Sequence, residues 1–330
     1  MTAADLLVAV LWIGLTLYAL FGGADFGGGL WDLLAGRPER GAAQRELIEH
    51  SIGPVWEANH VWLIFVITLF WTGFPGAFAS FAATLYIPLT LAALGIIARG
   101  SAFAFRKVTA EFRQRRLFGA AFASSSVVTP FFLGTTLGAV ASFRVPADLA
   151  RGDVLGSWWN PTSVLTGVLA VLSTAYLAAV FLTDDARRAG APELIAVFRR
   201  RALGSGLLLG VCTLIGLPVL QVDAPHLFAG LLGPALPVVV VSVVFGVLSL
   251  GLLAARRYRL VRVTAALAVT AVLWAWGAAQ YPVMLPGLTV PAAATEPRVL
   301  HLVLWVLLVG AVLLVPSLLW LYALFQRERR

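Results

Sequence analysis

The sequence is short of charged residues: Asp, Glu, Lys and Arg make up only 12% of its 330 residues. A soluble domain typically carries about 25%. So few charges can cover little water-facing surface, and 60% of the residues are hydrophobic. The composition therefore excludes an ordinary soluble protein and indicates a chain that lies in lipid.

Cysteine is almost absent as well. The single cysteine, Cys212, excludes an internal disulfide, a c-type haem attachment and an iron–sulfur ligand set. It stands in an apolar run, where we interpret it as a small buried side chain. The sequence also lacks a P-loop, a dinucleotide-binding glycine motif after a strand, and a serine nucleophile motif.

What the sequence has in abundance is long apolar segments. Nine of them approach or exceed the roughly 20 residues that cross a membrane, and continuous runs of this length exclude barrel strands. The first follows no basic region and precedes no cleavage site, so we predict an uncleaved helix. The predicted spans are 5–24, 55–72, 77–98, 117–140, 162–182, 203–221, 227–254, 260–281 and 299–325.

Basic residues orient these spans. If the helices alternate in direction, 21 of the 24 Lys and Arg residues fall on one side, and only Arg144, Arg151 and Arg298 fall on the other. Basic loops stay cytoplasmic, so we predict the N-terminus outside and the C-terminus in the cytoplasm. The net charge of +8 is explained by topology, which excludes nucleic acid as a partner.

The first polar cluster within the apolar segments is Gly22–Gly29, where five glycines surround Asp25. Glycine lets another helix approach closely, but it also weakens a helix. One interpretation is a buried carboxylate lined by close-packed helices. The other is a loose, glycine-rich helix end with a solvated aspartate.

The second cluster begins the second predicted span. Glu57 and His60 are three residues apart and share a helix face. Asn59 lies beside them, and Trp56 and Trp62 suit a membrane interface. A capping role in the first helical turn would explain Glu57 alone.

The predicted orientation brings the two clusters together. The first span ends inside and the second begins inside, so Asp25, Glu57 and His60 should lie at a similar depth near the cytoplasm. Such groups could form a proton-entry relay. The histidines outside this cluster, His50, His226 and His301, could ligate haem iron but are more typical of loops and helix starts.

These motifs resemble those of subunit II of cytochrome bd-type quinol oxidases. The resemblance is carried by GGADFGGG, SIGPVWEANHVWL, LFWTGFP, Arg99 near Arg106, and QYPVMLPGLTVPAAATEP before the last span. It covers residues 21–106 and 281–325, while the middle matches only in hydropathy. The chain departs from the family pattern at four positions: Glu57, where Asp is more usual; Ala58, where Gly is common; His60, where Gln or a similar residue is common; and Ala104, where some members carry an acid.

The resemblance implies an all-α integral membrane protein of the prokaryotic plasma membrane, with one polytopic domain over residues 1–330. Helices 1–4 (about 5–140) and 5–8 (about 162–281) would form two four-helix bundles, with helix 9 (about 299–325) peripheral. The complex would oxidise quinol and reduce dioxygen to water, with haems b and d in partner subunit I and none bound directly by this chain. A quinone is bound in some members, and a small single-helix accessory subunit accompanies others.

The resemblance also assigns roles to residues of this chain. Asp25 and Glu57 match acids of the proton route, to which we add His60, and Trp62 matches the tryptophan near the oxygen entrance. Trp56, Asn59 and Arg99 support the motifs. Two alternatives stay open: a secondary transporter or channel with buried acids, and a purely structural scaffold for subunit I.

Overall fold

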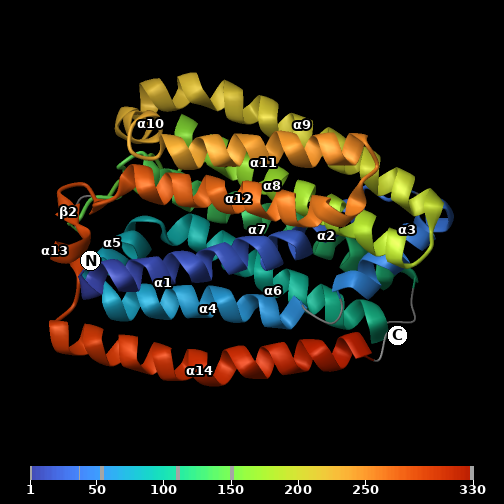
Figure 1. The fold of residues 1–330 in the computed structure, drawn as a ribbon, viewed down its shortest axis with the longest axis horizontal. Coiled ribbons are helices and arrows are strands. Elements are labelled where there is room, and N and C mark those ends of the chain that lie inside the picture. Colours follow the sequence, from blue (N-terminus) through green and yellow to red (C-terminus); the bar gives the residue numbers. More distant parts are fainter. Residues whose placement is uncertain (1, 37, 53–55, 109–111, 149–151, 328–330) are drawn as a thin grey trace.

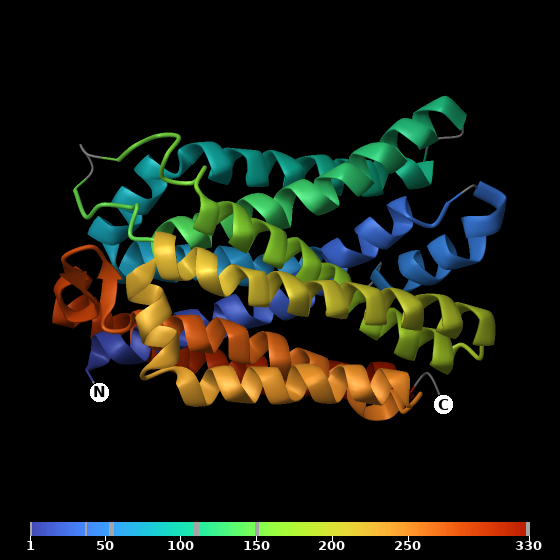
Figure 2. The same ribbon diagram turned by 90° about the horizontal axis from the view of Figure 1, so that it is seen from above.

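The computed structural model describes residues 2–36, 38–52, 56–108, 112–148 and 152–327, almost all of them in long helices aligned with one axis (Figures 1 and 2). The helices are α1 (Ala3–Leu17), α2 (Gly23–Leu33), α3 (Pro38–Ile52), α4 (Trp56–Gly73), α5 (Pro75–Thr84), α6 (Tyr86–Val108), α7 (Phe112–Ala141), α8 (Pro161–Arg188), α9 (Pro192–Asp223), α10 (Pro225–Leu232), α11 (Leu236–Ala254), α12 (Tyr258–Gln280), α13 (Val290–Ala293) and α14 (Pro297–Arg327). A short antiparallel hairpin, β1 (Val283–Leu285) and β2 (Leu288–Thr289), precedes α13.

Eight helical stretches in the described residues are long and apolar enough to span a membrane. The second predicted span corresponds to α4, whose described apolar part, Asn59–Gly73, is shorter than such a span. The all-helical class is therefore confirmed, while the count of nine, the two bundles and the orientation stay predictions. In Figure 1, α1 begins at one end of the long axis and α14, at the edge beside α4, ends at the other.

The first predicted span, 5–24, was too short. The helix continues through a π-helical turn, Tyr18–Gly22, into α2, and together they form one apolar stretch from Ala3 to Leu33. The glycines that suggested a helix end lie inside the helix. Neighbouring helices pack against them, and this packing outweighs their weak helix propensity.

Two other predicted spans are interrupted, and proline explains both interruptions. The span 77–98 is divided at Leu85 into α5 and α6. The Pro88 ring would clash with the carbonyl of residue 84 in a continuous helix. The span 227–254 is divided into α10 and α11 around Gly233 and Pro234 for the same reason.

The tightest packing lies between α2 and α8. A Cβ added to Gly27 would lie 1.9 Å from the carbonyl oxygen of Thr174 and 2.7 Å from the Cβ of Ala178. Trp31 strengthens the same contact by donating from Nε1 to the carbonyl of Ala175, at 2.8 Å. Only glycine at position 27 allows this approach, which holds α2 and its Asp25 at the centre of the protein.

A substitution at this contact has a clear expected result. Gly27→Ala should destabilise the protein by about 1–3 kcal/mol, because the new methyl group meets backbone that cannot rotate away. The measurement is the thermal unfolding midpoint in detergent. The matched control is Gly204→Ala on α9, where an added Cβ has no neighbour within 4 Å. Equal midpoints for the two variants would contradict the packing account.

Candidate functional site: a buried ion pair on helices α2 and α6

The centre of the site is an ion pair between Asp25 of α2 and Arg99 of α6. Arg99 Nη2 lies 2.7 Å from Asp25 Oδ1 and donates also to the backbone oxygen of Asp25, at 2.9 Å. Asp25 is 3% exposed and Arg99 is 1% exposed. Two opposite charges so far from water are tolerated because each satisfies the other.

Residues around the Arg99 guanidinium make further favourable contacts with it. Its Nη1 donates to Ser126 Oγ on α7. Its guanidinium lies over the rings of Phe122, at 4.2 Å, and Phe26, at 5.1 Å, a favourable cation–π arrangement. Gly29 makes room for these groups, since a Cβ there would lie 2.6 Å from Arg99 Nη1.

The predicted third span, 77–98, ends just before Arg99, which would place Arg99 in the cytoplasmic loop that follows. This was wrong, because α6 continues to Val108 and Arg99 lies within it. Arg99 thus contributes to the buried site and not to the charge of the loop. Two interpretations of Asp25 were open, a buried carboxylate and a solvated helix end. The structure shows the buried carboxylate.

Several polar atoms near the pair have no hydrogen-bond partner among the described residues. They are Asp25 Oδ2, Tyr18 Oη, Asn59 Nδ2 and His60 Nδ1. Tyr18 and His60 both lie within range of the charges of Asp25 and Arg99. Buried polar atoms normally find partners, so this group offers sites for ordered water.

Helix α4 brings the second sequence cluster to this group. The His60 ring meets the Phe26 ring edge-on, with centroids 6.3 Å apart, and Asn59 is 4% exposed. Trp62 is half-buried and packs edge-on against Phe65, at 6.1 Å. Trp56 and Glu57 belong to the first turn of α4, but their side chains lie outside the described residues.

Sequence reasoning did not identify Tyr18 or Ser126. Tyr18 opens the π-helical turn Tyr18–Gly22, a feature often found at functional sites that no residue pattern predicts. Ser126 ends a run of three serines. A serine run is too common within helices to mark an arginine contact.

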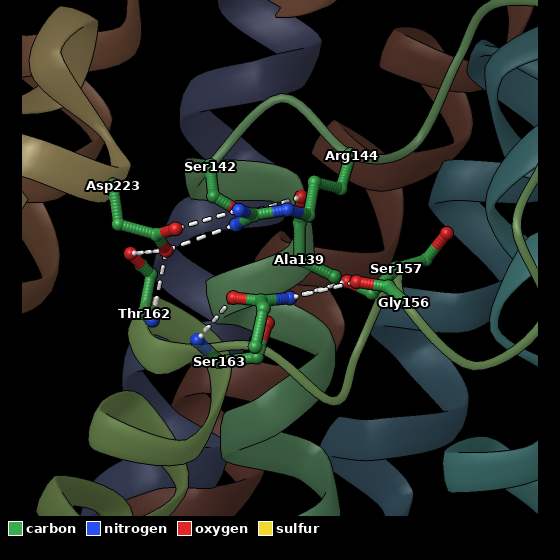
Figure 3. A network of polar contacts seen from close by, with 9 residues as sticks. Ala139, Ser142, Arg144, Gly156, Ser157, Thr162, Ser163 and Asp223 are labelled. Atoms are coloured by element: carbon green, nitrogen blue, oxygen red, sulfur yellow. Dashed lines mark hydrogen bonds and ion pairs between the residues drawn. The ribbon is translucent and has the colours of Figure 1, made fainter.

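A second polar network joins the segment that follows α7 to the start of α8 and the end of α9 (Figure 3). Arg144 Nη1 and Nη2 donate to the two carboxylate oxygens of Asp223, at 2.9 and 2.6 Å. Thr162 also donates to this carboxylate, and the Asn160 side chain caps α8 by accepting from Ser163 N. The hydrogen bonds to Asp223 raise the pKa of Arg144, so the network stays charged and ties three helices together.

The three histidines outside the second sequence cluster lie at the surface. His50, His226 and His301 are exposed, and His226 packs on Phe143, with ring centroids 4.5 Å apart. Within the described ranges, no group of three or more His, Cys, Asp or Glu side chains could hold a metal ion. The buried polar centre of the described residues is the Asp25–Arg99 ion pair.

Fold and site together define a class: a polytopic helical membrane protein with an acid–arginine pair buried between its helices. The sequence profile of the family "Cytochrome bd terminal oxidase subunit II" matches residues 3–325. The chain therefore belongs to this family, and it is a multi-pass membrane protein.

Individual relatives of the chain carry names from the same family. The chain is 22% identical over 346 residues to a Bacillus subtilis protein assigned as cytochrome bd menaquinol oxidase subunit II, covering all of this chain and 97% of that protein. It is 30% identical over 181 residues to the B. subtilis cytochrome bd ubiquinol oxidase subunit 2, covering 54% of this chain and 51% of that one. Its fold is similar to a chain of the bd oxidase from Geobacillus thermodenitrificans, with a TM-score of 0.73, 25% identity, and coverage of 98% and 99%.

Proposed function

We propose that this chain is subunit II of a terminal oxidase that couples quinol oxidation to the reduction of dioxygen to water. The observation that carries the proposal is the family match across residues 3–325. The names of the relatives include both menaquinol and ubiquinol, so the proposal covers quinols as a class. Family membership does not favour the transporter alternative.

The partner in this proposal is subunit I, which would hold haems b and d. That division rests on the resemblance to the family, in which subunit I carries the haems. A bound quinone and a single-helix accessory subunit remain part of the proposal on the family resemblance alone. The exposed apolar faces of the helices would be covered by subunit I and by lipid.

Within the complex, we assign the Asp25 region to proton uptake. Reduction of dioxygen to water consumes protons, and a reaction centre inside the membrane needs a path for them. Asp25 Oδ2, His60 Nδ1 and Tyr18 Oη are buried and open to hydrogen bonding. Water on these atoms would connect the groups, with Glu57 at the entrance and Trp62 beside a path for dioxygen.

Spectroscopy tests the oxidase assignment. The chain is purified in detergent with whatever co-purifies, and a reduced-minus-oxidised spectrum is recorded. We expect haem d bands when subunit I is present and none from this chain alone. Purification without a haem-containing partner would contradict the assignment and favour the transporter.

Glu57 provides a separate test of the proton route. Glu57→Gln should slow quinol oxidase turnover without preventing assembly, because the amide cannot accept and release a proton. Glu57→Asp should be nearly silent, since it restores the residue more usual in the family. Turnover is measured as oxygen consumption with saturating quinol. Equal rates in the wild type and both variants from pH 6 to 8 would remove Glu57 from the route.

A further inference from the structure

A small cavity lies beside the buried ion pair, at the end of the molecule that the basic residues mark as cytoplasmic. Its walls come from Asp32 of α2, Arg45 and Glu49 of α3, Phe103 of α6 and Phe122 of α7, with two isoleucines of α3. Its volume is about 20 Å³, and a cavity of roughly 10–15 Å³ already admits a water molecule. We call it the vestibule.

The polar walls of the vestibule suit water. Asp32 is 6% exposed and pairs with Arg45, whose Nε lies 3.2 Å from Asp32 Oδ1. Arg45 Nη2 also donates to the carbonyl of Gly36, at 2.6 Å. Glu49 is exposed and forms the rim. Two carboxylates against one guanidinium leave the lining ionisable groups with a net negative charge, which attracts protons.

On each of three helices, a residue of the vestibule and a residue of the ion-pair site lie on the same face. Asp32 follows Asp25 by two turns of α2, and Phe103 follows Arg99 by one turn of α6. On α7, which runs in the opposite direction, Phe122 precedes Ser126 by one turn. In each helix the vestibule residue therefore lies closer to the cytoplasmic end, on the same face.

Phe122 lies between the two regions and touches both. Its ring lines the vestibule and also lies against the Arg99 guanidinium, at 4.2 Å. The Phe103 ring packs beside it, with centroids 6.0 Å apart. The seven residues from Asp25 to Asp32 correspond to about 10 Å of helix, and Phe122 is the side chain that contacts both levels.

We propose that the vestibule is a hydrated site that collects cytoplasmic protons at Asp32, two helical turns from the Asp25–Arg99 pair. A proton binds to the Glu49 carboxylate, passes to a water molecule in the vestibule and then to the Asp32 carboxylate. No electron moves and no bond other than O–H forms or breaks. This inference rests on the proposed role of Asp25 but adds an entrance separate from Glu57.

The test is the pH profile of turnover in the purified oxidase complex. Glu49→Gln should lower turnover about threefold or more at pH 8, where protons are scarce and local collection matters, and only slightly at pH 6. Asp32→Asn should do the same. Glu49→Asp should restore the wild-type profile, because it keeps the carboxylate. Glu46→Gln is the matched control, since Glu46 is exposed on the same helix one turn earlier but does not line the vestibule.

Two results would overturn the inference: a wild-type profile in Glu49→Gln, or the same loss in Glu46→Gln, which would indicate a general surface-charge effect. If Asp32→Asn fails to assemble, the Glu49 variants decide alone. Asp25→Asn, measured in parallel, separates the two proposals. Loss in Asp25→Asn with silent Glu49 variants contradicts only the vestibule, whereas full activity in Asp25→Asn contradicts the proton route itself.

Discussion

Arg99→Met is expected to destabilise the protein by about 3–5 kcal/mol, the usual cost of leaving one member of a buried ion pair without its partner. Methionine can fill much of the space between Phe26 and Phe122, but it offers no charge to Asp25. Asp25 is only 3% exposed, so bulk solvent cannot replace the guanidinium as its partner. The measurement is the thermal midpoint and yield of the detergent-purified complex.

A double variant separates charge from packing. Asp25→Leu combined with Arg99→Met removes both charges, and replacing a buried pair by apolar residues is often neutral or stabilising. We therefore expect the double variant to recover most of the midpoint but not the turnover. The control is Arg262→Met, because Arg262 is partly exposed and its partner Asp184 keeps Arg187 and Arg188 when Arg262 is removed. If Arg99→Met matches Arg262→Met in stability, the pair is not structural.

The largest effect on activity is expected from Asp25→Asn. The amide oxygen can still accept from Arg99, which also keeps the backbone oxygen of Asp25 as an acceptor. Assembly should therefore survive. The group that exchanges protons is lost, and losses of this kind are typically about 10²–10⁴-fold in rate. Because the vestibule and Glu57 remain, we expect a loss of turnover of about tenfold or more, at least as large as in Glu57→Gln.

Oxygen consumption by the purified complex measures this effect, and the reduced-minus-oxidised spectrum confirms that equal amounts of haem are present. Asp25→Glu keeps the carboxylate and should recover part of the rate. Full turnover in Asp25→Asn with normal haem content would show that Asp25 serves only to bind Arg99. The scaffold alternative would then explain the site better than proton uptake.

Much of the fold follows from apolar segments alone. The centres of the helices were predictable because lipid imposes about 20 apolar residues on each span. The interruptions at Leu85 and Gly233 were not, because half of the six prolines within the predicted spans, namely Pro130, Pro218 and Pro316, are accommodated inside a continuous helix. Whether a proline ends a helix depends on neighbours that satisfy the freed carbonyls, and one sequence does not show them.

The candidate site was predictable in part for a related reason. Asp25 was identified because an acid among glycines in an apolar segment is unusual. Arg99 was recognised as a motif residue but interpreted as a loop charge, because a basic residue just after an apolar run normally lies in water. Only the three-dimensional approach of α2 and α6 shows that the two charges neutralise each other. The vestibule depends on Phe122 and Glu49, which no sequence pattern connects.

The most direct test of the central claim is proton uptake itself. The oxidase is reconstituted in vesicles with the cytoplasmic face outward, the reduced complex is mixed with dioxygen, and a pH-sensitive dye in the outer medium follows proton consumption. We expect the wild type to take up protons from the medium in step with oxygen reduction, and Asp25→Asn to do so about tenfold more slowly or worse. Proton uptake at the wild-type rate in Asp25→Asn, with haem content unchanged, would contradict the account.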